Sequence, residues 1–105
     1  MELRHLRYVV ALAKELNFGR AAARLNISQP PLSQQVRQIE DELGVKLFHR
    51  TKRIVELTEA GRAFVAGARE ILALAERTVA AAVAAGRGEI GELTVGTVTT
   101  TDNGF

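Results

Sequence analysis

Hydrogen-bonding side chains collect on one side of a helix predicted over residues 29–43. Leu32, Val36, Ile39 and Leu43 are spaced four, three and four residues apart, so they form one apolar stripe. The opposite side carries amide, hydroxyl and guanidinium groups that can donate or accept hydrogen bonds at base edges in a DNA groove. An ordinary solvated helix face is the alternative. The candidate base-contacting residues are Gln29, Ser33, Gln34 and Arg37, with Pro30, Gln38 and Asp41 on the same side.

A basic cluster follows this helix. Arg50, Lys52 and Arg53 lie at or between two short strand-like pieces, residues 46–50 and 54–57. Basic side chains at a hairpin tip suit phosphates or a minor groove. Most exposed basic turns have no such role, but the position just after a candidate recognition helix favours nucleic acid.

The elements that would hold these residues are helices. Residues 2–16 and 19–25 have helical periodicity, with a break at Asn17. A tight turn then ends at Ser28, a good N-cap, and Gly44 stops the third helix. Two helices, a turn and a helix with an apolar back predict a helix-turn-helix. With the hairpin as a wing, residues 1–57 form a winged helix-turn-helix in a mainly α chain.

One long helix is expected over residues 58–85. Thr58 can cap it, although Gly61 stands where a full capping box has Glu or Gln. Twenty-eight residues span roughly 42 Å, too long for the core of so small a domain. Its wide apolar face must meet another chain or another domain, so we interpret it as a dimerisation helix. The candidate contact residues are Phe64, Ile71, Leu72, Leu74 and Val79.

The end of the chain suggests a further domain. Residues 86–92 have the composition of a hinge, and residues 93–98 alternate like a strand. Because a lone strand is not stable, we expect residues 93–105 to begin a domain of a longer protein.

Composition limits the function classes. The 105 residues include no cysteine and two histidines, so we expect no disulfide, metal site or cofactor. No apolar run reaches the length of a membrane span, which favours a cytoplasmic protein.

Residues 1–53 hold ten Lys/Arg against five Asp/Glu, whereas residues 54–105 hold four against seven. A basic half suits a polyanion. With no nucleophile–base pair or phosphate loop, an enzyme is disfavoured, and a pure interaction module with a vestigial helix-turn-helix remains the other alternative.

Several stretches resemble the N-terminal signature of LysR-type transcriptional regulators. They are FGRAAARLNISQPPLSQQVRQIE at residues 18–40, LGVKLFHR at 43–50 and LTEAG at 57–61. The likeness covers residues 2 to about 98. The opening MELRHLRY and the Gln-Pro-Pro turn resemble the branch that controls aromatic and chloroaromatic breakdown. The resemblance implies a sequence-specific regulator that binds operator DNA as a dimer or tetramer, with RNA polymerase as a further partner.

The resemblance also implies residue roles. Ala22 and Ala23 would pack under the third helix, Arg53 would reach a minor groove, and the long helix would pair antiparallel with its twin. Many members of the same branch have Arg where this chain has Gln34, so a base contact there would differ. The groove-facing start of the recognition helix would comprise Ser28, Gln29, Pro30, Pro31 and Ser33.

An effector site is the last expectation. The resemblance makes residues 93–98 the first strand of an effector-binding α/β domain, and ligands of such sheets bind beyond the strand ends. Thr99 and Thr100 would then help to hold a small carboxylate effector in the full-length protein. A plain Thr-rich turn is the alternative.

Overall fold

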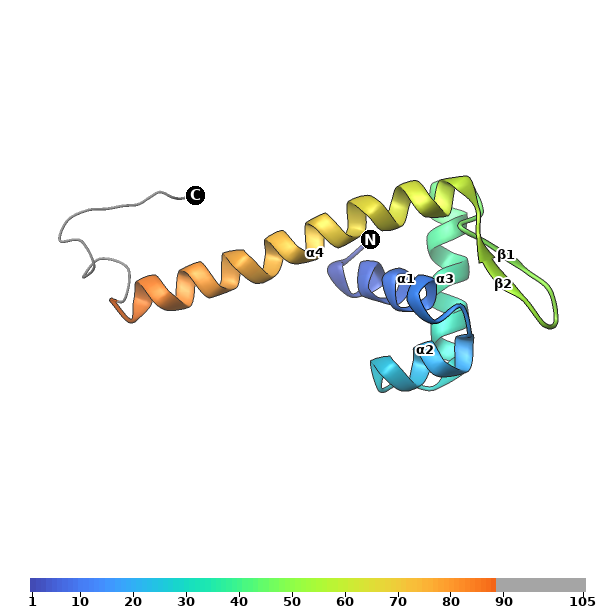
Figure 1. The fold of residues 1–105 in the computed structure, drawn as a ribbon, viewed down its shortest axis with the longest axis horizontal. Helices are drawn as coiled ribbons and strands as arrows, with labels where there is room; N and C mark the ends of the chain where they lie inside the picture. Colours follow the sequence, from blue (N-terminus) through green and yellow to red (C-terminus); the bar gives the residue numbers. More distant parts are fainter. Residues whose placement is uncertain (89–105) are drawn as a thin grey trace. The chain divides into compact units, whose positions relative to one another are not determined.

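The computed structural model describes residues 1–88. Contacts divide the chain into two units, Met1–Leu72 and Ala73–Phe105, and α4 continues from the first into the second. The predicted strand 93–98, Thr99, Thr100 and most of the predicted hinge lie outside the described residues. The elements in chain order are α1 (Leu3–Glu15), α2 (Phe18–Leu25), α3 (Gln29–Leu43), β1 (Phe48–Arg50), β2 (Val55–Leu57) and α4 (Glu59–Gly86) (Figure 1).

These elements confirm the predicted fold class, a winged helix-turn-helix followed by a long helix. In the first unit α1, α2 and α3 pack against one another, and the β1–β2 hairpin extends beyond them as the wing (Figure 1). The predicted third helix has the observed bounds, and the fourth is shifted by one residue.

Left-handed residues end the first three helices. Leu16, Asn26 and Gly44 have φ values of 50°, 59° and 76°, and each donates its backbone N–H to a carbonyl of the preceding helix. This conformation satisfies carbonyls that the helix itself leaves unbonded. Because these C-caps end each helix abruptly, the loops between α1, α2 and α3 are short.

The two N-caps of the helix-turn-helix differ from each other. The Asn17 side chain accepts a hydrogen bond of 2.8 Å from the backbone N–H of Arg20. Ser28 occupies the N-cap of α3, but its side chain makes no capping bond, so the prediction that it caps the helix is wrong in that respect. A cap accepts from the second or third residue of a helix, and here these are Pro30 and Pro31, which have no N–H.

The core lies between the helices and the base of the wing. The predicted stripe of α3 is buried at Leu32, Val36 and Ile39, but Leu43 is 40% exposed, because the helix ends there. In α2 the buried alanines are Ala21 and Ala22, whereas Ala23 is exposed, so its predicted packing under α3 is wrong. The largest fully buried side chains are Val9, Leu12, Leu32, Val36, Ile39, Leu47 and Phe48.

The antiparallel wing pairs Phe48 with Leu57 and Arg50 with Val55. At its base, the Thr58 hydroxyl accepts from the N–H of Gly61 (2.9 Å) and donates to the carbonyl of Lys46 (2.7 Å). A Cβ at Gly61 would collide with the carbonyl oxygen of Leu47. Close approach of α4 to the wing therefore explains why glycine stands where a capping box would have Glu or Gln.

Burial divides α4 along its length. Gly61, Val65 and Ala68 are buried in the first unit, so the expectation that the other helices leave the whole apolar face uncovered is wrong for its first part. Phe64 is half-buried and packs against the same core. This is why the first unit extends to Leu72 and does not end with the wing.

Candidate nucleic-acid interface

The predicted base-contacting face of α3 is exposed. Because Leu32, Val36 and Ile39 point into the core, the polar side of the helix faces solvent. Ser33 is half-buried, and the other predicted residues of this surface are exposed. They are Ser28, Gln29, Pro30, Pro31, Gln34 and Arg37.

A cleft of about 380 Å³ joins the start of this helix to the wing. Gln29 of α3, the start of α2 and the wing tip share it, although they are far apart in sequence. The structure thus brings one predicted helix residue together with all three predicted wing cations. The lining residues are Leu16, Asn17, Phe18, Gly19, Gln29, Arg50, Thr51, Lys52, Arg53 and Val55.

The start of α2 was not among the predicted site residues. The backbone N–H groups of Phe18 and Gly19 belong to the first turn of a helix, where no intrahelical acceptor exists. Such groups, with the positive end of the helix dipole, favour an anion. A Cβ at Gly19 would lie 3.3 Å from Asn17 Oδ1 and 3.7 Å from Gln29 Oε1, so glycine keeps this edge of the cleft open. The sequence signal was Asn17 itself, because an asparagine that breaks one helix can also cap the next.

The wing tip carries two exposed cations. Lys52 and Arg53 form no ion pair within residues 1–88. The Thr51 hydroxyl accepts hydrogen bonds from the backbone N–H groups of Arg53 (3.3 Å) and Ile54 (3.0 Å). The turn is therefore held by its own side chain, while its cations remain available to an anionic ligand.

Arg50, the third wing cation, is placed differently. Its Nη2 donates to Glu40 Oε1 at 3.0 Å, and its Cζ lies 5.5 Å from the centre of the Phe18 ring. Glu40 itself is 2% exposed and also accepts from the backbone N–H groups of Leu47 (2.8 Å) and Phe48 (3.2 Å). Arg50 is thus bound to the protein as well as lining the cleft.

Sequence reasoning missed Glu40. It follows Leu32 by eight residues and Val36 by four, so it lies on the buried side of α3. An acidic residue on an apolar stripe, ten residues before an arginine, was the signal that could have predicted a buried ion pair.

Comparisons with known proteins place this surface in context. Residues 3–62 match the family described as bacterial regulatory helix-turn-helix protein, lysR family. The chain belongs to the LysR family. It is 56% identical over 96 residues to the uncharacterized HTH-type transcriptional regulator YnfL of Escherichia coli K12, covering 91% of this chain and 32% of YnfL. It is 53% identical over 93 residues to the HTH-type transcriptional regulator TfdT of Cupriavidus pinatubonensis, covering 89% and 41%.

A solved structure of a LysR-family protein bound to DNA has the same fold. The DNA-binding domain of CbnR in its DNA complex is 46% identical, with a TM-score of 0.78, covering 82% of this chain and 99% of that one. The chain thus spans a third to two fifths of these two curated relatives and nearly all of a domain crystallised with DNA.

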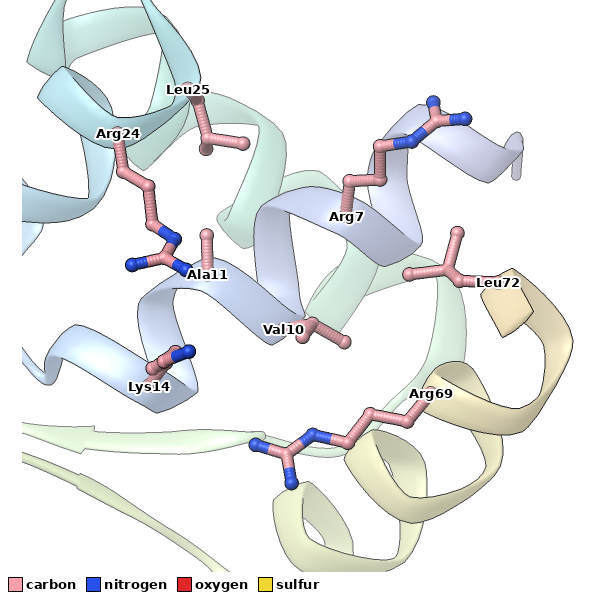
Figure 2. A pocket seen from close by; sticks show the side chains of 8 residues that line it. All are labelled: Arg7, Val10, Ala11, Lys14, Arg24, Leu25, Arg69 and Leu72. Atoms are coloured by element: carbon pink, nitrogen blue, oxygen red, sulfur yellow. The ribbon is translucent and has the colours of Figure 1, made fainter. Parts of the chain in front are cut away.

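This LysR-family chain has a second basic surface of different character. A groove of about 500 Å³ lies between α1, α2 and the first part of α4. Figure 2 shows its lining side chains, with Arg24 and Arg69 pointing toward it. Arg24 is paired with Glu15 at 3.1 Å. The floor is apolar, unlike that of the cleft beside the wing. Its lining residues are Arg7, Val10, Ala11, Lys14, Arg24, Leu25, Arg69 and Leu72.

The later part of α4 exposes large apolar side chains. Of the predicted dimerisation residues, Ile71, Leu74 and Val79 are 48%, 56% and 63% exposed, and Leu72 is half-buried in the groove wall. Val83, not predicted, is 43% exposed. Within residues 1–88, no three His, Cys, Asp or Glu side chains gather where they could hold a metal ion, and none of the helices qualifies as a membrane span.

Proposed function

We propose that the chain is the DNA-binding part of a sequence-specific bacterial transcription regulator acting in the cytoplasm, and not an enzyme. The observation that carries this proposal is the cleft where the exposed start of α3, the start of α2 and the cationic wing meet. Its relatives support it, because both named proteins are HTH-type transcriptional regulators. The similar domain of CbnR was crystallised with DNA.

The polar face of α3 is the surface we assign to the major groove. In a helix-turn-helix the first half of the recognition helix contacts base edges. Gln29, Gln34 and Arg37 have the length and the donors for such contacts. Ser28, Ser33 and the two prolines shape the start of the helix against the DNA surface.

The cleft is the place we assign to a backbone phosphate. The N–H groups of Phe18 and Gly19 can donate to its oxygens, and Lys52 supplies charge from the wing. Arg53 at the exposed tip is the residue we assign to the adjacent minor groove. Arg50 contributes through its hydrogen bond to Glu40.

The exposed apolar side of α4 is the surface we assign to a second copy. Ile71, Leu74 and Val79 leave large side chains in solvent that pairing would bury. Phe64 and Leu72 are partly covered by the chain's own first unit, so we give them a smaller share. For the whole protein we propose a dimer or tetramer on operator DNA, contact with RNA polymerase, and a small carboxylate effector held near Thr99 and Thr100.

Selection from a pool of randomised duplex DNA tests this function. We expect the chain to enrich one sequence with two related half-sites and to bind it more tightly than an unrelated duplex. Fluorescence anisotropy should show affinity that falls steeply as salt rises, because cations on the protein displace counterions from DNA. No enrichment and no salt-dependent binding would support the interaction-module alternative.

A further inference from the structure

The buried carboxylate of Glu40 joins the recognition helix to the wing. Within residues 1–88 its three hydrogen-bond donors come from the wing strand β1 or the residue before it: the N–H groups of Leu47 and Phe48 and the guanidinium of Arg50. Arg50 in turn lies over the ring of Phe18, the first residue of α2. The ion pair and this ring contact, which share Arg50, therefore link the three elements that surround the cleft.

A buried ion pair is not explained by stability alone. Removing two charges from water costs about as much as their attraction returns, and apolar replacements are often as stable. Such a pair fixes the relative orientation of the two segments that carry it, because a carboxylate and a guanidinium form their hydrogen bonds only in a defined geometry. Glu40 is 1% exposed and Arg50 25% at the side chain, so water competes little for the bond.

We propose that Glu40 is a positioning residue for DNA recognition: through Arg50 it fixes the wing relative to α3 and the start of α2. The inference rests on the proposed function and adds that sequence preference depends on a residue which does not touch DNA. Within residues 1–88 the turn at the wing tip forms hydrogen bonds only within itself, around Thr51, so the orientation of the wing is set at its base.

Glu40→Gln is the sharpest variant. The amide has the shape of the carboxylate, and its oxygen can still accept from Leu47 and Phe48. Its NH2 group then faces Nη2 of Arg50, and two donors repel each other. The substitution thus breaks the bond to Arg50 but keeps the bonds from the backbone N–H groups of Leu47 and Phe48.

The readout is the ratio of dissociation constants for an unrelated duplex and for the selected duplex. A variant that is only less stable loses affinity for both in proportion to its folded fraction, so the ratio stays constant. We expect Glu40→Gln to lower the ratio about tenfold without weakening binding to the unrelated duplex. We also expect Arg53→Ala to have little further effect on the ratio in the Glu40→Gln background, because the wing is already misplaced.

Two controls are available in the chain. Glu59→Gln removes an exposed pair with Arg62 (2.9 Å) and should leave the ratio unchanged. Ile39→Val lowers core stability in the same helix and should also leave it unchanged. If Glu40→Gln fails to fold, Arg50→Lys, which keeps the charge but loses the planar fork, should lower the ratio by a smaller factor.

The outcomes separate the two proposals. If the unsubstituted chain prefers no duplex, both the proposed function and this inference are overturned. If it prefers the selected duplex, and Glu40→Gln or Arg50→Lys folds yet keeps the full ratio and the full Arg53→Ala effect, only the positioning role is overturned.

Discussion

Two surfaces of the described chain, the first half of α3 with the wing tip and the later part of α4, leave large side chains exposed, and their chemistry differs. The first presents amides and cations such as Gln34 and Arg53, whereas the second presents Ile71, Leu74 and Val79. Polar groups in water gain little free energy until a ligand offers oriented acceptors. Apolar groups gain about 25 cal/mol of free energy for each Å² of their surface that is removed from water. The difference supports the two partners we propose, a polyanion for the first surface and a second copy of the chain for the other.

The apolar surface should give the largest effect when it is broken. We expect Ile71→Glu to prevent dimerisation, because an unpaired charge buried in an interface costs several kcal/mol. Binding to a duplex with two half-sites should then fall by about 100-fold, since the second contact loses its effective concentration. Sedimentation at micromolar concentration and anisotropy measure the two effects. Glu70→Gln, on an exposed neighbour, is the control, and a dimer that survives Ile71→Glu would contradict the assignment.

Removing the cationic side chain of Arg53 from the wing tip should have the next largest effect. Arg53→Ala is expected to weaken DNA binding about tenfold and to reduce the slope of log affinity against log salt by about one. The loss should be greater on A·T-rich flanks, whose narrow minor groove attracts arginine. Titration on duplexes that differ only in their flanks measures this. Equal loss on all flanks would instead place Arg53 on a phosphate.

Removing a single side-chain amide from α3 should change the preference for DNA sequence more than the overall affinity for DNA. Gln34→Ala should cost about 1 kcal/mol at one base pair, the low end for a direct base contact. Affinity for an unrelated duplex should not change. Competition among single-base variants of the selected duplex provides the measurement, and unchanged preference at every position would show that this side of α3 does not face the bases.

The two N-caps should affect the stability of the fold, and the smallest of all the expected effects is that of Ser28. Asn17→Ala should lower the free energy of unfolding by about 1 kcal/mol, because its capping bond is lost. Ser28→Ala should lower the free energy of unfolding by only a few tenths of that amount, because Pro30 and Pro31 have no backbone N–H that the Ser28 side chain could accept from. Denaturant unfolding compares them. Equal losses would mean that Ser28 caps α3 in solution.

The sequence predicted those features that depend on local patterns. Apolar spacing located α3 and its exposed polar side, and Gly44 located its end. Glu40 and the start of α2 were missed because their roles depend on contacts with residues distant in the chain: Arg50 for the carboxylate, and the wing for Gly19. The burial of Val65 was likewise clear only once neighbouring elements were in place. The missing capping bond of Ser28, in contrast, could have been predicted locally, because Pro30 and Pro31 occupy the positions that would donate to it.

Site-specific photo-crosslinking tests the division between the two surfaces most directly. A benzophenone side chain would be placed at position 34 in one protein and at position 74 in another, and each would be irradiated with the selected duplex. We expect position 34 to attach to DNA and position 74 to attach to a second protein chain. DNA attached at position 74, or protein and no DNA at position 34, would rule out this division of the two surfaces.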